Sequence, residues 1–165
     1  YSLESHTLVK KFRFSKVDGS QDDNFCFSPD GTEFYNIERH IDSCKTALSI
    51  YDTSDFSLKK KILHDDFSLV LTAVEYNTEE NKVFLLGYMR EPEIGVAYKF
   101  FVGELIKDSL KNIVYISEKE HDFYLDCKNF EIHSFSVVDC YSPDEVDRIK
   151  NAKHSLAKLW KYYSK

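Results

Sequence analysis

Ser57-Leu58-Lys59-Lys60-Lys61-Ile62 has a near copy on each side of it in the chain. Thr7-Leu8-Val9-Lys10-Lys11-Phe12 begins 50 residues before it, and Ser109-Leu110-Lys111-Asn112-Ile113-Val114 begins 52 residues after it. A second landmark keeps nearly the same step, because residues 27–34 (FSPDGTEF) are followed 49 residues later by residues 76–83 (YNTEENKV). Steps of this size are typical of repeats that bury an apolar face against the next repeat. The chain is therefore expected to consist of units of about 50 residues.

Each unit is expected to be made of β-strands. Thirteen Phe and eleven Tyr against three Pro favour strands, since aromatic side chains fit a pleated, half-buried surface. Ser28-Pro29-Asp30-Gly31 has the residues of a tight turn, and three consecutive lysines at 59–61 suit the edge of a sheet. The strands are predicted at residues 8–14, 24–28, 33–37, 46–51, 58–63, 69–76, 82–89, 96–105 and 113–116, with a weaker pair at 122–126 and 130–138.

The C-terminal part is predicted to be helical instead. Ser142, Pro143 and Glu145 form a capping box with proline at the first helical position. Apolar residues then recur at intervals of three to four, at Val146, Ile149, Leu156, Trp160 and Tyr163. We therefore expect a repeat region over residues 1–140 and a helix over residues 141–165 that packs on the same domain.

Two motifs resemble WD40-like and related β-propeller repeats. They are the turn Phe27-Ser28-Pro29-Asp30-Gly31 and the strand end Tyr51-Asp52-Thr53, in which Tyr-Asp takes the place of the family's Trp-Asp pair. His64, followed by Leu71, Ala73, Val74 and Tyr76, adds to the resemblance, which covers residues 1–138. The chain departs from WD40 proper because it has no Gly-His pair and because His64 lies three residues too far from its strand. The polar tetrad of that family is therefore not carried over.

The predicted fold is all-β, with antiparallel four-stranded meanders of a partial β-propeller and one C-terminal amphipathic helix. Propellers need four to eight blades, whereas this chain has two full units and a fragment at each end. It could belong to a longer propeller, complete a ring with a second copy as a homodimer, or form an open curved sheet. The chain begins at Tyr1 and not at Met, so we expect it to be processed or excised from a longer protein. The alternative fold is a β-sandwich in which the similarity at a spacing of about 50 residues is coincidental.

Charge and cysteine spacing exclude several classes of protein. The net charge of −6 disfavours non-specific binding of nucleic acid, which depends on clustered Lys and Arg. The chain contains no run of 18 apolar residues, so no transmembrane helix is expected. Its four cysteines, at 26, 44, 127 and 140, have no Cys-x-x-Cys spacing and are interpreted as reduced structural thiols. We favour a cytoplasmic location, although the sequence carries no signal that fixes the compartment, and we expect no cofactor.

Two polar loops are candidates for a site. Asp22 and Asp23, together with Asp18, offer oxygen ligands for a hard cation such as calcium. His64, Asp65 and Asp66 place a potential acid or base beside carboxylates. The simpler explanation of the first group is a solvent-exposed acidic loop. That of the second is a turn whose side chains form hydrogen bonds with its own backbone. The chain also lacks a nucleophile elbow, a P-loop and a His-Glu-x-x-His motif, which favours a non-enzyme.

The functional hypothesis rests on fold analogy. We expect a non-enzymatic protein-interaction or scaffold module, with recognition loops at residues 15–24, 39–43, 64–67 and 90–94. Trp160 and Tyr163 are candidate partner-binding residues, because aromatic anchors are common at interface hot spots. The other interpretation of these two residues is that they pack on their own sheet. The alternative function is a fragment of a propeller enzyme or metal-binding propeller, whose site would use Asp22, Asp23, His64, Asp65 and Asp66.

Overall fold

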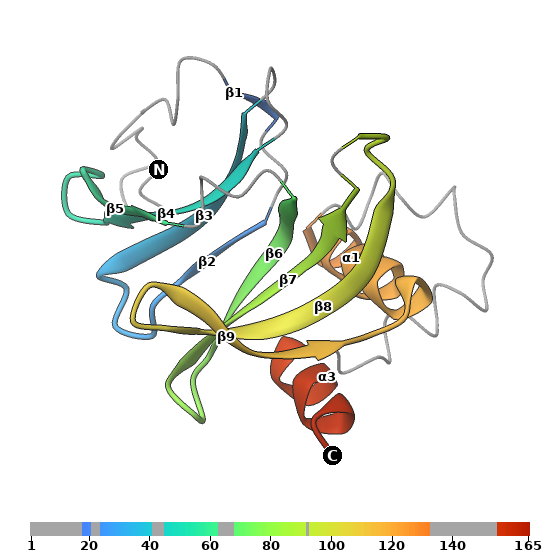
Figure 1. Cartoon of the computed structure of the whole chain (residues 1–165). Helices are drawn as coiled ribbons and strands as arrows, with labels where there is room; N and C mark the ends of the chain where they lie inside the picture. Colours follow the sequence, from blue (N-terminus) through green and yellow to red (C-terminus); the bar gives the residue numbers. More distant parts are fainter. Residues whose placement is uncertain (1–17, 21–23, 41–44, 63–67, 92, 133–154) are drawn as a thin grey trace.

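The computed structural model describes residues 18–20, 24–40, 45–62, 68–91, 93–132 and 155–165, excepting the side chains of residues 18–20, 40 and 129–132. Two antiparallel sheets lie face to face, and two helices lie beyond the second sheet (Figure 1). The fold of the described residues is therefore all-β with a minor helical part, as the sequence predicts. The division into residues 1–140 and 141–165 stays a prediction.

The first sheet, called sheet 1 below, is a meander whose first strand is broken in two. It contains β1 (Asp18–Ser20), β2 (Phe25–Phe27), β3 (Glu33–His40), β4 (Thr46–Asp52) and β5 (Leu58–Ile62). β1 and β2 pair with successive parts of β3, so together they occupy the position of one edge strand. β4 then pairs with β3 and with β5. Sheet 1 thus has the layout of a four-stranded unit.

The second sheet, sheet 2, repeats this layout without a break. Its order is β6 (Leu69–Asn77), β7 (Lys82–Arg90), β8 (Ala97–Ile106) and β9 (Ser109–Tyr115). The two copies of the Ser-Leu-x-x-x-apolar stretch fall on β5 and β9, the last strand of each sheet. The repeat in the sequence is therefore a repeat in the structure, and both sheets are blade-like.

The two sheets share one apolar core. Leu48 and Ile50 of β4 point toward sheet 2, where they meet Leu71 of β6 and Leu85 of β7. Strand alternation places Ala47, Ser49 and Tyr51 on the opposite face of sheet 1. Leu48, Leu71 and Leu85 are fully buried, so this contact joins the two sheets into one unit.

The helices cover the other face of sheet 2. α1 (Glu118–Ile132) and α3 (Leu156–Tyr163) lie on the side of that sheet that faces away from sheet 1 (Figure 1). A second core forms there, in which Phe84 of β7 and Val102 of β8 pack with Tyr124 of α1 and Leu156 of α3. Neither helix, nor any other within the described ranges, has the length and apolar character of a membrane span.

Most predicted strands are observed, with two corrections near the C-terminus. The strand predicted at 122–126 and the first three residues of the one predicted at 130–138 are wrong, because residues 118–132 form α1. Residues 133–138 lie outside the described residues. Ser117 begins this helix through a reciprocal capping box with Glu120. The long C-terminal helix is also corrected, since Ser155 has extended φ and ψ and caps a new helix through its contact with Lys158 N. The capping box at Ser142 and the strand at residues 8–14 lie outside the described residues.

Candidate functional site

The candidate cation and acid–base residues cannot be placed. Asp22, Asp23, His64, Asp65 and Asp66 all lie outside the described residues. Within the residues that are described, no group of three or more His, Cys, Asp or Glu side chains is arranged to hold a metal ion. Of the four predicted recognition loops, the one at 90–94 is seen apart from residue 92, and its Ile94 side chain is 72% exposed.

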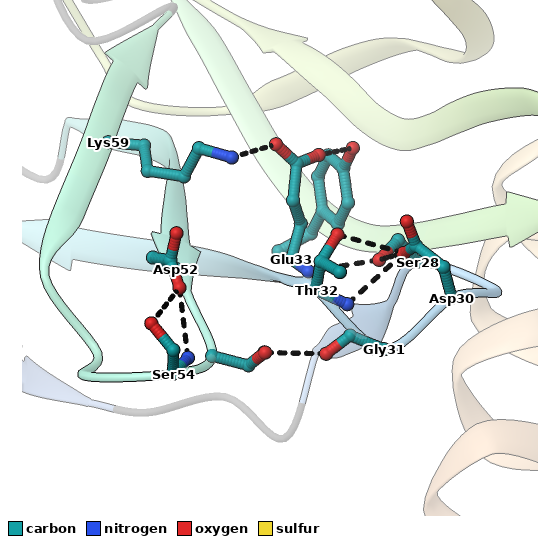
Figure 2. A network of polar contacts seen from close by, with 10 residues as sticks. Ser28, Asp30, Gly31, Thr32, Glu33, Asp52, Ser54 and Lys59 are labelled. Carbon is teal, nitrogen blue, oxygen red and sulfur yellow. Dashed lines mark hydrogen bonds and ion pairs between the residues drawn. The ribbon is translucent and has the colours of Figure 1, made fainter.

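A polar network fixes the turn ends of sheet 1 (Figure 2). Asp30 Oδ1 accepts hydrogen bonds from Ser28 Oγ at 2.5 Å and from Thr32 N and Oγ1 at 3.1 and 2.9 Å. The bonds from Ser28 and Thr32 hold the pKa of Asp30 below its usual value. Gly31 supplies the positive φ of 70° that the turn requires. Asp30 Oδ1 is thus occupied by donors of its own turn, and Gly31 O accepts a hydrogen bond from Thr53 Oγ1, so the network is structural.

The same end of the molecule holds a small hollow between the sheets. It has a volume of about 360 Å³ and is lined by the turn and by Tyr35, Tyr76 and Asn81. Glu33 accepts hydrogen bonds from Lys59 Nζ and from Tyr35 Oη, both at 2.6 Å (Figure 2). Tyr76 Oη donates to Asn81 Oδ1 at 2.6 Å. The polar side chains named here are thus hydrogen-bonded within the protein. We interpret them as stabilising the turn end of the sheets and not as a catalytic group.

A Thr–His–Asp arrangement links β6 to α1, with Thr72 and His121 buried and Asp122 exposed. His121 Nε2 lies 2.9 Å from Thr72 Oγ1, and His121 Nδ1 lies 2.9 Å from Asp122 Oδ1. This order of groups is that of a nucleophile, a base and an orienting acid. However, Thr72 and His121 are only 7% and 3% exposed, and the imidazole packs against the rings of Tyr88 and Phe100. The arrangement therefore anchors the helix.

Glu75 performs a second anchoring role on the same strand. Its Oε2 atom accepts a hydrogen bond from Tyr124 Oη at 2.8 Å and another from the backbone N of Leu156 at 3.0 Å. One carboxylate oxygen thus holds α1 and the first residue of α3 against β6. Neither this contact nor the one at Thr72 was expected from the sequence, because both depend on α1.

A groove runs along α1. This groove has a volume of about 760 Å³ and is lined by Tyr163, Phe123 and the first turns of α1, including Glu118, Glu120, Asp122 and Asp126. Among the described residues that line it, Lys119 is the one with a basic side chain. The groove therefore combines negative charge with aromatic walls, which suits a basic ligand with apolar parts. We refer to it as the α1 groove.

Tyr163 stands at the wall of the α1 groove and is held there by Glu120. The hydrogen bond that Tyr163 donates to Glu120 raises the pKa of Tyr163 to about 12. Burial works to raise the pKa of Glu120, but the hydrogen bonds from Tyr163 and Ser117 outweigh it and keep that pKa low. Tyr163 also borders a shallower hollow along β9. Its position thus remains compatible with the predicted contact to a partner.

Trp160 takes a different position, directed toward sheet 2. Its ring packs on Phe84 with centroids 6.0 Å apart, and Nε1 donates to the backbone O of Asn112. Lys82 lies over the indole at 5.8 Å. Trp160 is therefore engaged with its own sheet in this structure, and its predicted contact with a partner stays a prediction.

Comparison with known proteins gives no relative. No protein-family model, no curated protein and no solved structure matches the chain.

Proposed function

We propose that this protein is a non-enzymatic interaction module built on propeller-like repeats, and that the α1 groove receives a basic segment of a protein partner. Support for the repeats comes from the two blade-like meanders, which end on matching strands, β5 and β9. The WD40-like resemblance of the turn at 27–31 points in the same direction.

The observation that carries the binding proposal is the lining of the α1 groove. A volume of about 760 Å³ accommodates several side chains of an extended peptide. Glu118 and Lys119 are exposed at its rim, while Tyr163 offers an aromatic face to a Lys or Arg side chain. Aromatic residues are enriched at the core of protein interfaces, and complementary charges steer a partner toward the site.

Peptide titration tests this proposal. A short fluorescent lysine-rich peptide is titrated with the full chain, and an acid-rich peptide of equal length serves as the comparison. We expect saturable binding of the basic peptide, which Tyr163→Ala weakens about tenfold, as loss of an interface aromatic does. Tyr162→Ala is the matched control, because Tyr162 is the neighbouring tyrosine and lies outside the groove lining. Equal loss in both variants, or equal binding of both peptides, would reject the α1 groove as the site.

A further inference from the structure

α3 depends on its neighbours for its helical form. It contains eight residues, whereas an isolated helix shorter than about 12–15 residues is marginal in water. The contacts that hold it come from other elements. Glu75 of β6 accepts a hydrogen bond from Leu156 N at 3.0 Å, and Phe84 of β7 packs on Trp160 with ring centroids 6.0 Å apart. Docking and folding of α3 are therefore one event, and a detached α3 loses its helical form.

α1 supplies a further contact, and this contact lies in the α1 groove. Tyr163, the last residue of α3, donates a hydrogen bond to Glu120 of α1, and both residues line the groove. The other described residues of the lining fall within 117–126, at the start of α1. Docked α3 thus completes the groove with one aromatic side chain, and detachment of α3 takes that side chain away.

We propose that ligand binding at the α1 groove is coupled to docking of α3, so that a bound basic segment holds α3 against sheet 2. The inference rests on the proposed function and adds the regulation of the same site. A groove that binds its ligand more tightly when α3 is docked must, once occupied, shift α3 toward the docked form. The linkage also works in reverse, because a change that detaches α3 lowers the affinity of the groove for a basic ligand.

The size of the coupling follows from Tyr163. Tyr163→Ala is expected to weaken binding of the lysine-rich peptide about tenfold, and detachment of α3 removes the same side chain from the groove. Because coupling between two equilibria is reciprocal, saturating peptide lowers the equilibrium constant for detachment of α3 by the same factor of about ten. The effect has this upper limit because the residues of α1 contact the peptide in both forms.

Amide hydrogen exchange of the full chain measures detachment of α3. Leu156 N donates to Glu75 and Leu159 N donates to the backbone O of Ser155, so both amides exchange with solvent when these bonds open. Neither leucine lines the groove, so direct cover by the peptide does not account for slower exchange. The rates are followed by NMR, first without peptide and then with the lysine-rich peptide at saturation. We expect saturating peptide to slow exchange at both amides about tenfold.

Tyr163→Ala is the decisive variant in this experiment. Its peptide concentration is raised until the groove is again saturated, and its exchange rates are compared with its own rates without peptide. We expect no slowing, because detachment of α3 no longer removes a contact with the peptide. Tyr162→Ala is the matched control and should keep the slowing, since Tyr162 lies outside the groove lining. If Tyr163→Ala leaves both amides unprotected without peptide, Tyr163→Leu is judged by the same criteria.

The outcomes distinguish failure of the coupling from failure of the proposed function. Peptide that saturates the protein by fluorescence without slowing exchange in α3 overturns the coupling and leaves the proposed function standing. Equal slowing in the parent and in Tyr163→Ala also overturns the coupling, because it would then not depend on the side chain that α3 contributes to the groove. A peptide that does not bind rejects the proposed function, and the coupling with it.

Discussion

Glu33 shows how single side chains hold the turn end of sheet 1. Lys59 Nζ and Tyr35 Oη both donate to its carboxylate, and the ion pair joins β3 to β5 (Figure 2). The hydrogen bond from Lys59, followed by that from Tyr35, holds the pKa of Glu33 below its usual 4.5. The charged form of Glu33 is therefore favoured in the folded protein.

This pKa gives stability a defined dependence on pH. A carboxylate whose pKa is lower in the folded than in the unfolded state stabilises the fold above the unfolded value, and the contribution is lost as the pH falls through the folded value. We expect the free energy of unfolding to drop below about pH 4.5, and to drop less steeply in Glu33→Gln. Urea unfolding between pH 3 and pH 7 measures both slopes. Glu79→Gln removes the same charge from an exposed turn residue, and an equally shallow slope in that variant would contradict the assignment.

At the scale of elements, Trp160 helps the buried Leu156 to hold α3 on sheet 2. The indole packs on Phe84, and a hydrogen bond to Asn112 fixes its orientation. We expect Trp160→Ala to lower the free energy of unfolding by about 3 kcal/mol, since truncation of a packed tryptophan removes a large contact area. Chemical denaturation measures the loss. Tyr162→Ala is the control, because Tyr162 is 70% exposed, and an equal effect of the two changes would refute the packing role.

The strands could be predicted because their signals are local. Each signal predicts one strand or its end. Alternation in residues 46–51 predicts β4, the turn at 28–31 predicts the start of β3, and the lysine run at 59–61 predicts β5 as an edge strand. α1 could not be predicted in the same way, because Phe123, Tyr124 and Leu125 form a continuous apolar run that is also typical of a buried strand. The capping box at Ser117 and Glu120 was the signal that identifies the helix.

The candidate site was less accessible to sequence reasoning than the strands. The sequence marks Tyr163 as a partner-binding candidate. The α1 groove, however, is made by Glu118, Asp122 and Asp126, on a helix for part of which the sequence predicts strands. Thr72 and His121 are 49 residues apart, and only the packing of α1 on β6 brings them together. Contacts of this kind depend on the arrangement of elements, which residue spacing does not report.

At the scale of the whole molecule, the shared core makes the two sheets one folding unit. Leu85 of β7 is fully buried and belongs to the core that joins sheet 1 to sheet 2. We expect Leu85→Ala to lower the free energy of unfolding by about 2–5 kcal/mol and to weaken both sheets together. Trp160 fluorescence follows sheet 2, and alkylation of Cys26, whose pKa burial raises to about 12, follows sheet 1. Coinciding transitions are the expected result. Separate transitions would show two independent units.

The contact between Trp160 and Asn112 also bears on solubility. β9 is the last strand of sheet 2, and an exposed last strand can template pairing with another chain. The strand is irregular near Asn112, which has a positive φ of 47°. The backbone O of the same residue already accepts a hydrogen bond from the Trp160 indole of α3. Both features discourage strand addition at this edge. If α3 detached from sheet 2, the edge of β9 would therefore become available for pairing with another chain while both sheets were still folded.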